Sequence, residues 1–230
     1  MAKKRVSRSR KRDLDKPDEF ISFWTKVFGW ISEYKLIFSS ALGVMVVVII
    51  VIMGMIYGIK KSEDKAFALL QQGIINYQTK LKTNTPETAY LDVEKDFQLI
   101  MDKYSNRTGG KLAGFIYANI CYAAKDYNKA IELYNKSLIN FNDRLFIKNL
   151  ILNGLGYAYK AKKNYKTAAK YFEIIASDPY YSIKDEALFN LGELYAAAGD
   201  HEKSTSAFKK IISDHSDSMY IELVKERVTG

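Results

Sequence analysis

The sequence predicts an all-α protein in which a single transmembrane helix is followed by a superhelix of helical hairpins. Three observations lead to this class. Residues 36–59 are apolar without interruption, one helix-pair pattern recurs three times after them, and no segment alternates polar and apolar residues as a strand would. The expected domains are a basic cytoplasmic tail (1–19), a juxtamembrane amphipathic segment (20–35), the transmembrane helix (36–59) and a repeat domain (62–230).

The amino-terminal tail is strongly basic. Residues 1–35 carry ten Lys or Arg and five Asp or Glu, and most of the positive charge lies in residues 3–5 and 8–12. Positive charge before a span favours retention on the cytoplasmic side, and it also attracts anionic lipid. We therefore expect a cytoplasmic amino terminus, with binding of a ribosome or nucleic acid through this tail as the alternative.

An aromatic segment precedes the span. Phe20, Phe23, Trp24, Val27 and Ile31 fall on one face of a helix. Trp and Phe accompanied by a single Lys are typical of the lipid headgroup level, so the segment is expected to lie at the membrane interface. Docking onto another membrane protein would require the same residues.

The span consists of 24 consecutive residues without a charge, 14 of which are Leu, Ile, Val or Phe. A helix of this length reaches about 36 Å, more than the hydrocarbon core of about 30 Å. Insertion gains roughly 4 to 8 kcal/mol from the large apolar residues. A cleavable signal peptide has a shorter apolar region of about 7–15 residues and an A-x-A-like site, so the sequence predicts an uncleaved anchor.

Three segments after the span align with one another: residues 115–134, 152–172 and 188–208. In each of them a small residue, Ala130, Ala168 or Ser204, recurs at spacings of 38 and 36 residues. The second and third segments follow L-G-x-x-Y, then Ala, then Phe, which is the tetratricopeptide repeat pattern. Each helix pair is amphipathic and must stack on its neighbours to cover its apolar face.

The residue types of this pattern have a packing role. Gly156 and Gly192 let the two helices of a pair cross closely, with a small residue such as Ala168 on the other side. The aromatic residues that follow are expected to wedge between successive pairs. In the first segment Ala118 and Cys121 replace the glycine and the tyrosine.

More divergent helices flank the three repeats. Helical periodicity covers residues 62–81, Thr85 and Pro86 begin a second helix, and residues 106–110 are expected to break it. Residues 140–143 and 177–179 have the composition of loops. A short helix that begins after residues 216–218 would cover the open end of the stack, giving about nine helices outside the membrane.

The sequence lacks the motifs of an enzyme. His201 and His215 belong to no metal-ligand spacing, and no phosphate-binding or nucleophile motif is present. Cys121 lies on an apolar helix face, where a buried and unreactive thiol is expected. We therefore expect no enzymatic activity, no cofactor and no metal. The 17 tyrosines fall mostly at repeat-core positions, which makes nucleic acid an unexpected partner.

The first helix of each pair should line the concave side of the stack, where a partner protein would bind. For any one residue on this side, packing against a neighbouring helix would explain the residue type as well as partner binding does. Phe115 and Glu186 stand where a carboxylate clamp would require Lys, so a segment of another envelope protein is expected in place of a chaperone's carboxyl tail. The expected partner-binding residues are Phe115, Asn119, Tyr122, Asn153, Tyr157, Lys160, Phe189, Asn190 and Glu193.

Residues 97–104 and 110–118, together with the anchor and the degenerate repeats, resemble the bacterial YfgM-like proteins, ancillary subunits of the Sec translocon. The resemblance implies a single-pass protein of the bacterial inner membrane. Its periplasmic domain would associate with translocon subunits and periplasmic chaperones and would assist translocation or chaperone hand-over. Residues 152–208 also resemble repeats of outer-membrane assembly and Tol-Pal accessory proteins, so an envelope-assembly accessory role is the alternative.

Overall fold

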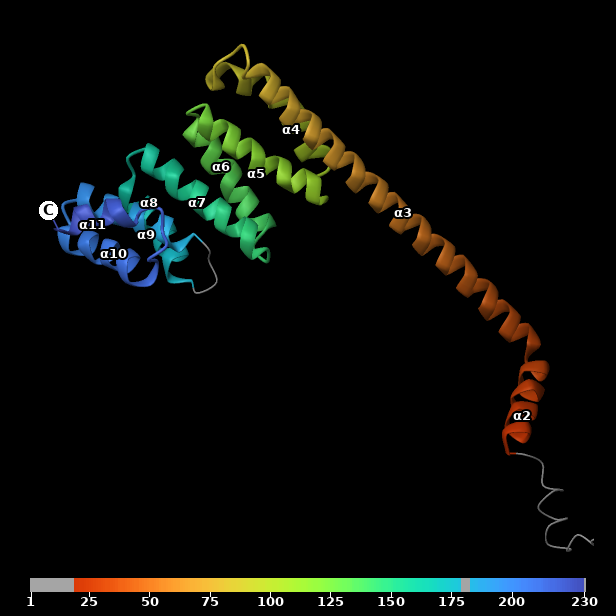
Figure 1. The fold of residues 1–230 in the computed structure, drawn as a ribbon. Helices are drawn as coiled ribbons and strands as arrows, with labels where there is room; N and C mark the ends of the chain where they lie inside the picture. Colours follow the sequence, from red (N-terminus) through yellow and green to blue (C-terminus); the bar gives the residue numbers. More distant parts are fainter. Residues whose placement is uncertain (1–18, 179–182, 230) are drawn as a thin grey trace, which may run out of the picture. The chain divides into compact units, whose positions relative to one another are not determined.

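The computed structural model describes residues 19–178 and 183–229, which form ten helices and no strand (Figure 1). The predicted all-α class is confirmed. The chain divides into two units, residues 1–59 and 60–230, which are described separately. The basic cluster of residues 3–12 and the end of the loop predicted at 177–179 lie outside the described residues.

The first unit contains α2 (Glu19–Glu33) and the beginning of α3 (Lys35–Lys80). The aromatic rings of α2 contact one another, with Trp24 centred 5.8 Å from Phe23 and 5.9 Å from Phe28, and all three side chains are exposed. An 18-residue window of α3 has a mean hydropathy of 2.9 and none of it is buried. In the described chain, α3 is the one helix long and apolar enough to cross a membrane.

Helix α3 does not end where the apolar stretch ends. The sequence predicts a span at 36–59 and a separate helix at 62–81, whereas the structure has one helix through both. Lys60 and Lys61 are good helix formers and no Pro lies between Lys35 and Pro86, so nothing in the sequence interrupts the helix.

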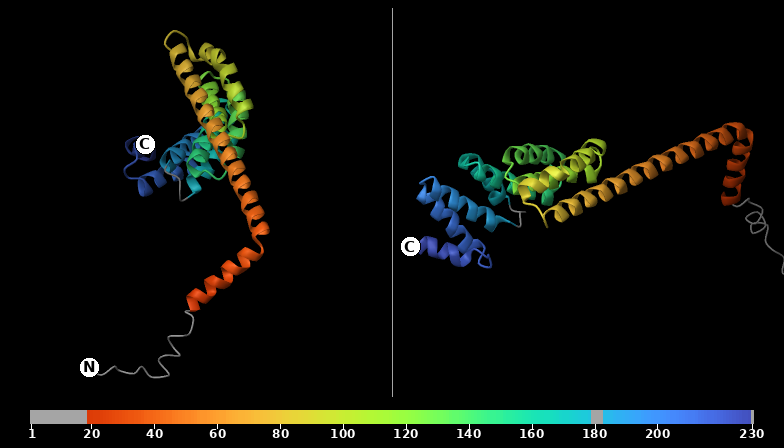
Figure 2. Two further views of the ribbon diagram at one scale, coloured as in Figure 1. Left: turned by 90° about the vertical axis from the view of Figure 1, so that its right-hand side faces the viewer. Right: turned by 90° about the horizontal axis from the view of Figure 1, so that it is seen from above.

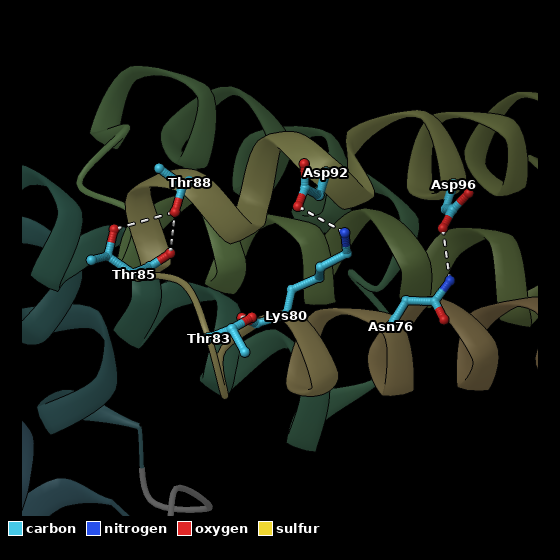
Figure 3. Close-up of polar contacts among 7 residues, drawn as sticks. All are labelled: Asn76, Lys80, Thr83, Thr85, Thr88, Asp92 and Asp96. Atoms are coloured by element: carbon cyan, nitrogen blue, oxygen red, sulfur yellow. Dashed lines mark hydrogen bonds and ion pairs between the residues drawn. The ribbon is translucent and has the colours of Figure 1, made fainter.

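The last turns of α3 pack on α4 (Pro86–Lys103) within the second unit (Figure 3). Asn76 donates a hydrogen bond to Asp96 over 3.0 Å, and Lys80 lies 3.2 Å from Asp92. The predicted start of α4 is confirmed, because Thr85 is its N-cap and Pro86 follows it.

The remaining helices form antiparallel hairpins that follow one another in sequence order in all three views (Figures 1 and 2). Each helix packs mainly on the helices that precede and follow it. The helices are α5 (Thr108–Ala123), α6 (Tyr127–Asn140), α7 (Leu145–Ala161), α8 (Tyr165–Ser177), α9 (Lys184–Ala197), α10 (His201–Asp214) and α11 (Ile221–Thr229).

Three hairpin turns share one backbone geometry. A residue with positive φ ends the first helix, and the N–H of the residue after it bonds the carbonyl five residues back, as in a Schellman motif. The side chain of that next residue then caps the second helix, so a single turn ends one helix and begins another. The positive-φ residues are Lys125, Lys163 and Gly199, and the capping residues are Asp126, Asn164 and Asp200.

The cores of the second and third repeat hairpins are built around a missing Cβ. A Cβ on Gly156 would lie 2.7 Å from the ring of Phe172. The ring of Phe172 therefore fills a space inside its own hairpin, and it belongs to the same buried cluster as Ala187 and Leu191 of the next hairpin. In the first repeat Ala118 already carries a Cβ, and the corresponding ring of Tyr134 lies against Gly154 of the next hairpin.

The junction into the repeats also differs from expectation. The predicted break at residues 106–110 is shorter, because α5 begins at Thr108 and includes Gly109 and Gly110. A Cβ on Gly109 would lie 2.8 Å from that of Ala66, so the glycine is required where α5 crosses α3. At the same crossing Glu63 of α3 accepts hydrogen bonds from the backbone N–H groups of Thr108 and Gly109, at 3.1 and 3.0 Å.

Candidate interaction surface

The residues expected to bind a partner lie on the first helix of each hairpin, as the repeat pattern requires. Asn153, Tyr157 and Lys160 recur at helical spacing on one face of α7. The corresponding part of α9 presents Glu186 and Asn190, one turn apart. The structure brings these five side chains together in one polar network between the second and third repeats.

Glu186 is the acceptor at the centre of this network. Its Oε1 accepts a 2.7 Å hydrogen bond from the Tyr157 hydroxyl and a 3.1 Å bond from Asn153 Nδ2. Burial, and then the bond to Glu186, raise the pKa of Tyr157, so the phenol stays protonated and remains a donor. In the sequence, Glu186 stands where a clamp for a partner's carboxyl terminus would require Lys. In the structure, its carboxylate accepts hydrogen bonds from two side chains of its own chain.

Asn190 connects Tyr157 to Lys160. Its Nδ2 lies 3.0 Å from the Tyr157 hydroxyl oxygen, and its Oδ1 accepts a 2.9 Å bond from Lys160 Nζ. Only 3 % of Asn190 is exposed. Burial lowers the pKa of Lys160. Asn190 therefore joins helices α7 and α9, and its side chain offers almost no surface to a partner.

The other two residues of the third repeat are partly covered by α11 and by Tyr220, the residue that precedes it. The ring of Phe189 stacks on that of Tyr220, with centroids 4.5 Å apart, and Glu193 lies 3.6 Å from Arg227. The short carboxyl-terminal helix therefore covers this end of the stack, as the sequence predicted.

The residues of the first repeat are held by a different set of contacts. Asn119 accepts a 2.6 Å hydrogen bond from the Tyr134 hydroxyl, and the ring of Phe115 lies 6.3 Å from the same tyrosine. Tyr122 packs on Tyr127 at 5.6 Å. These three residues are thus positioned by α6, their own hairpin partner, and Asn119 is the exposed one among them.

Sequence reasoning missed two further residues of this surface, Phe146 and Asn149. Phe146 lies in the first turn of α7 and is 71 % exposed. One turn away, Asn149 is buried, and its Oδ1 has no hydrogen-bond partner among the described residues; the same is true of Asn153 Oδ1. A signal was available, because residues 146, 149, 153, 157 and 160 continue one helical face of α7.

The residues considered for catalysis are not assembled into a site. Burial raises the pKa of Cys121 to about 12, so its thiol is protonated and unreactive at neutral pH. His201 is exposed at the start of α10, and His215 caps its end. In the described part of the chain, no three His, Cys, Asp or Glu residues are grouped so as to hold a metal ion.

Comparisons with known proteins agree with the repeat architecture. A family model described as a tetratricopeptide repeat-like domain matches residues 38–228. A relative from Pyropia yezoensis, named "Uncharacterized protein ycf37", is 28 % identical over 127 residues, which cover 53 % of this chain and 70 % of the relative. A protein of the same name from Porphyra purpurea is 28 % identical over 127 residues, covering 53 % of this chain and 72 % of the relative.

Proposed function

Because the chain belongs to the tetratricopeptide repeat-like domain family, we propose that it is a membrane-anchored scaffold that binds another protein on the inner face of its hairpins. Repeats of this kind imply protein–protein interaction. The observation that carries the proposal is Phe146, a large aromatic side chain that is 71 % exposed in the first turn of α7, on the helical face that continues through Asn153 and Tyr157. An exposed aromatic residue on a fixed helix suits an apolar side chain of a peptide segment.

The polar network behind this face supports the same function. Tyr157, Glu186, Asn190 and Lys160 are bonded to one another and fix α7 against α9. A binding surface on rigid helices loses little conformational entropy when a partner docks. The network therefore positions the surface. The more exposed residues around the network are the ones that contact the partner.

The anchor is proposed from α3. Its apolar side chains are exposed over the whole window of mean hydropathy 2.9, which would be unfavourable in water and favourable in lipid. Alkaline carbonate washing of membranes tests this directly. A chain that stays in the pellet supports the anchor, and a chain released intact into the supernatant contradicts it.

The finer proposal concerns compartment and partner. The charge of +5 over residues 1–35 favours a cytoplasmic amino terminus and an extracytoplasmic repeat domain, as expected for a bacterial inner-membrane protein. The resemblance to YfgM-like proteins then suggests translocon subunits or periplasmic chaperones as partners, and assistance in translocation or chaperone hand-over as the role.

Site-specific photo-crosslinking in intact membranes tests the interaction surface. A photoreactive amino acid at Phe146 should give one discrete protein adduct, whereas the same probe at Ile174, which is 46 % exposed on the second helix of its hairpin, should not. Identical adducts at both positions, or adducts to lipid alone at Phe146, would argue against the surface. Identification of a translocon subunit or chaperone would support the finer proposal, and another partner would overturn only that part.

A further inference from the structure

The turn between α4 and α5 (residues 104–107) lies beside α3, close to the point where α3 leaves the apolar stretch. Glu63 of α3 accepts hydrogen bonds from the backbone N–H groups of Thr108 and Gly109, which directly follow the turn. In the sequence the apolar stretch ends at Ile59, four residues before Glu63. A helix rises about 1.5 Å per residue, so these four residues correspond to about 6 Å along α3. The turn is therefore fixed about one helical turn beyond the last apolar residue.

In a membrane spanned by α3, this distance places the α4–α5 turn at the level of the lipid headgroups. The two headgroup regions add roughly 10 to 15 Å to a hydrocarbon core of about 30 Å, which is about 5 to 8 Å on each side. The turn between α3 and α4 lies at the other end of α4, whose 18 residues extend about 27 Å. That distance exceeds the depth of the headgroup region, so only the α4–α5 end of this helix reaches the lipid.

The chain carries positive charge at this level. Residues 60–65 and 102–111 together contain six Lys or Arg and three Asp or Glu. Glu63 is one of the three acidic residues, and its carboxylate is already bonded to the start of α5. None of the six basic side chains forms an ion pair within residues 19–178 and 183–229. Unpaired lysines occur elsewhere in the chain as well, but here the path of α3 brings the basic residues to the lipid surface.

Arg107 is the basic residue that the fold holds in the turn itself. It is the N-cap residue of α5, and its backbone N–H donates a 2.8 Å hydrogen bond to the carbonyl of Tyr104. Its part-buried side chain makes no capping bond, and its Nε has no hydrogen-bond partner in the described part of the chain. Because Glu63 occupies the first N–H groups of α5, the helix end itself is not free to bind an anion. The guanidinium, whose planar fork of donors matches a phosphate, is the group that remains.

We propose that Arg107 binds the phosphate of an anionic phospholipid at the surface of the membrane in which the chain is anchored; the proposal rests on the anchor proposed above. Lys60, Lys61 and Lys103 add to the attraction, because each basic side chain near an anionic surface contributes to it. A headgroup is favoured over a soluble phosphate compound because the anchor keeps headgroups at a high effective concentration beside the turn. The bound lipid holds the first hairpin of the repeat domain at the membrane surface.

A photoreactive amino acid at Asn106, in the full chain purified into nanodiscs, tests the position of the turn. Asn84 is the matched control, because both asparagines are exposed in turns at opposite ends of α4. The discs contain equal parts of phosphatidylcholine and phosphatidylglycerol, and mass spectrometry identifies the lipid adducts. We expect lipid adducts from Asn106 and none above background from Asn84, since about 27 Å of helix separates the two turns.

The composition of the adducts from Asn106 tests the role of Arg107. Phosphatidylglycerol should be enriched over phosphatidylcholine, and Arg107→Gln should lower this enrichment about fivefold. Arg107→Lys, which keeps the charge, should retain part of it. Lys82→Gln removes an exposed charge at the other end of α4 and should leave the enrichment unchanged.

Equal adduct yields from Asn106 and Asn84, or no lipid adduct from Asn106, would overturn the proposal and leave the anchor intact. An equal enrichment in Arg107→Gln and the wild type would also overturn it. A chain that does not enter the discs would contradict the anchor and the proposal with it, so the two failures are distinguishable. If circular dichroism shows that Arg107→Gln is unfolded, the wild type at about 1 M salt, where the Debye length is about 3 Å, replaces it. Loss of the enrichment at that salt supports the proposal, and an unchanged enrichment overturns it.

Discussion

The ring of Phe208 occupies the space in which a Cβ on Gly192 would lie, with its Cε1 only 2.2 Å from that position. Phe172 and Gly156 have the same relationship one repeat earlier. The glycine of the repeat pattern is therefore required by the aromatic residue that follows it on the second helix of the same hairpin.

Replacing Gly192 with Ala should lower the free energy of unfolding by about 1 to 3 kcal/mol, because the ring must move within a packed core. Gly114→Ala is the matched control. A Cβ there would lie 3.4 Å from Ser137 Oγ, an ordinary contact, and alanine favours a helix by about 1 kcal/mol. Urea unfolding of the full chain in detergent, followed by circular dichroism, measures both. Equal stabilities for the two variants would contradict the packing role of Phe208.

The Glu63 side chain should contribute to stability as a cap for a helix that lies 45 residues further along the chain. Helix α5 has Arg107 as its N-cap residue, and that side chain makes no capping bond. Glu63→Ala leaves the N–H groups of Thr108 and Gly109 without their acceptor and should cost about 1 kcal/mol. Asp64→Ala, at the next and exposed position of α3, is the control and should have no effect; a similar loss in both variants would exclude a capping role.

These two sites differ in how far sequence reasoning could find them. The Gly192 requirement was predictable, because the glycine, the small residue and the aromatic residue recur at fixed spacing in successive repeats. The capping of α5 by Glu63 was not predictable, because it occurs only once in the described repeats. Its partners are backbone N–H groups, which leave no pattern of residue types in the sequence. The same limit applies to Asn190, which was expected on a binding surface. The sequence shows its helical face, whereas its burial depends on contacts with α7.

The stability of the repeat domain should depend on pH through Glu87. A hydrogen bond from Lys125 is the largest of the effects that lower the pKa of Glu87 from 4.5 to about 2. Because the folded pKa is below the unfolded value, the stabilisation is fully present above pH 4.5 and is lost as the pH falls toward 2. The free energy of unfolding of the wild type should therefore fall more steeply over this range than that of Glu87→Gln. Parallel curves for the two proteins would contradict the interaction.

The hydroxyl of Tyr157 can position the interaction surface through its bond to Glu186, or it can bind the partner directly, and the two roles can be separated by mutation. Tyr157→Phe removes a donor from a part-buried carboxylate and should cost about 1 to 3 kcal/mol of stability. Tyr165→Phe is the control, because that ring is 37 % exposed. Glu186→Gln keeps an acceptor, and in the double variant with Tyr157→Phe the combined cost should be smaller than the sum of the single costs.

If Tyr157 only positions the surface, folded Tyr157→Phe should retain the crosslink from Phe146. Loss of that crosslink without loss of stability would instead place the Tyr157 hydroxyl in direct contact with the partner.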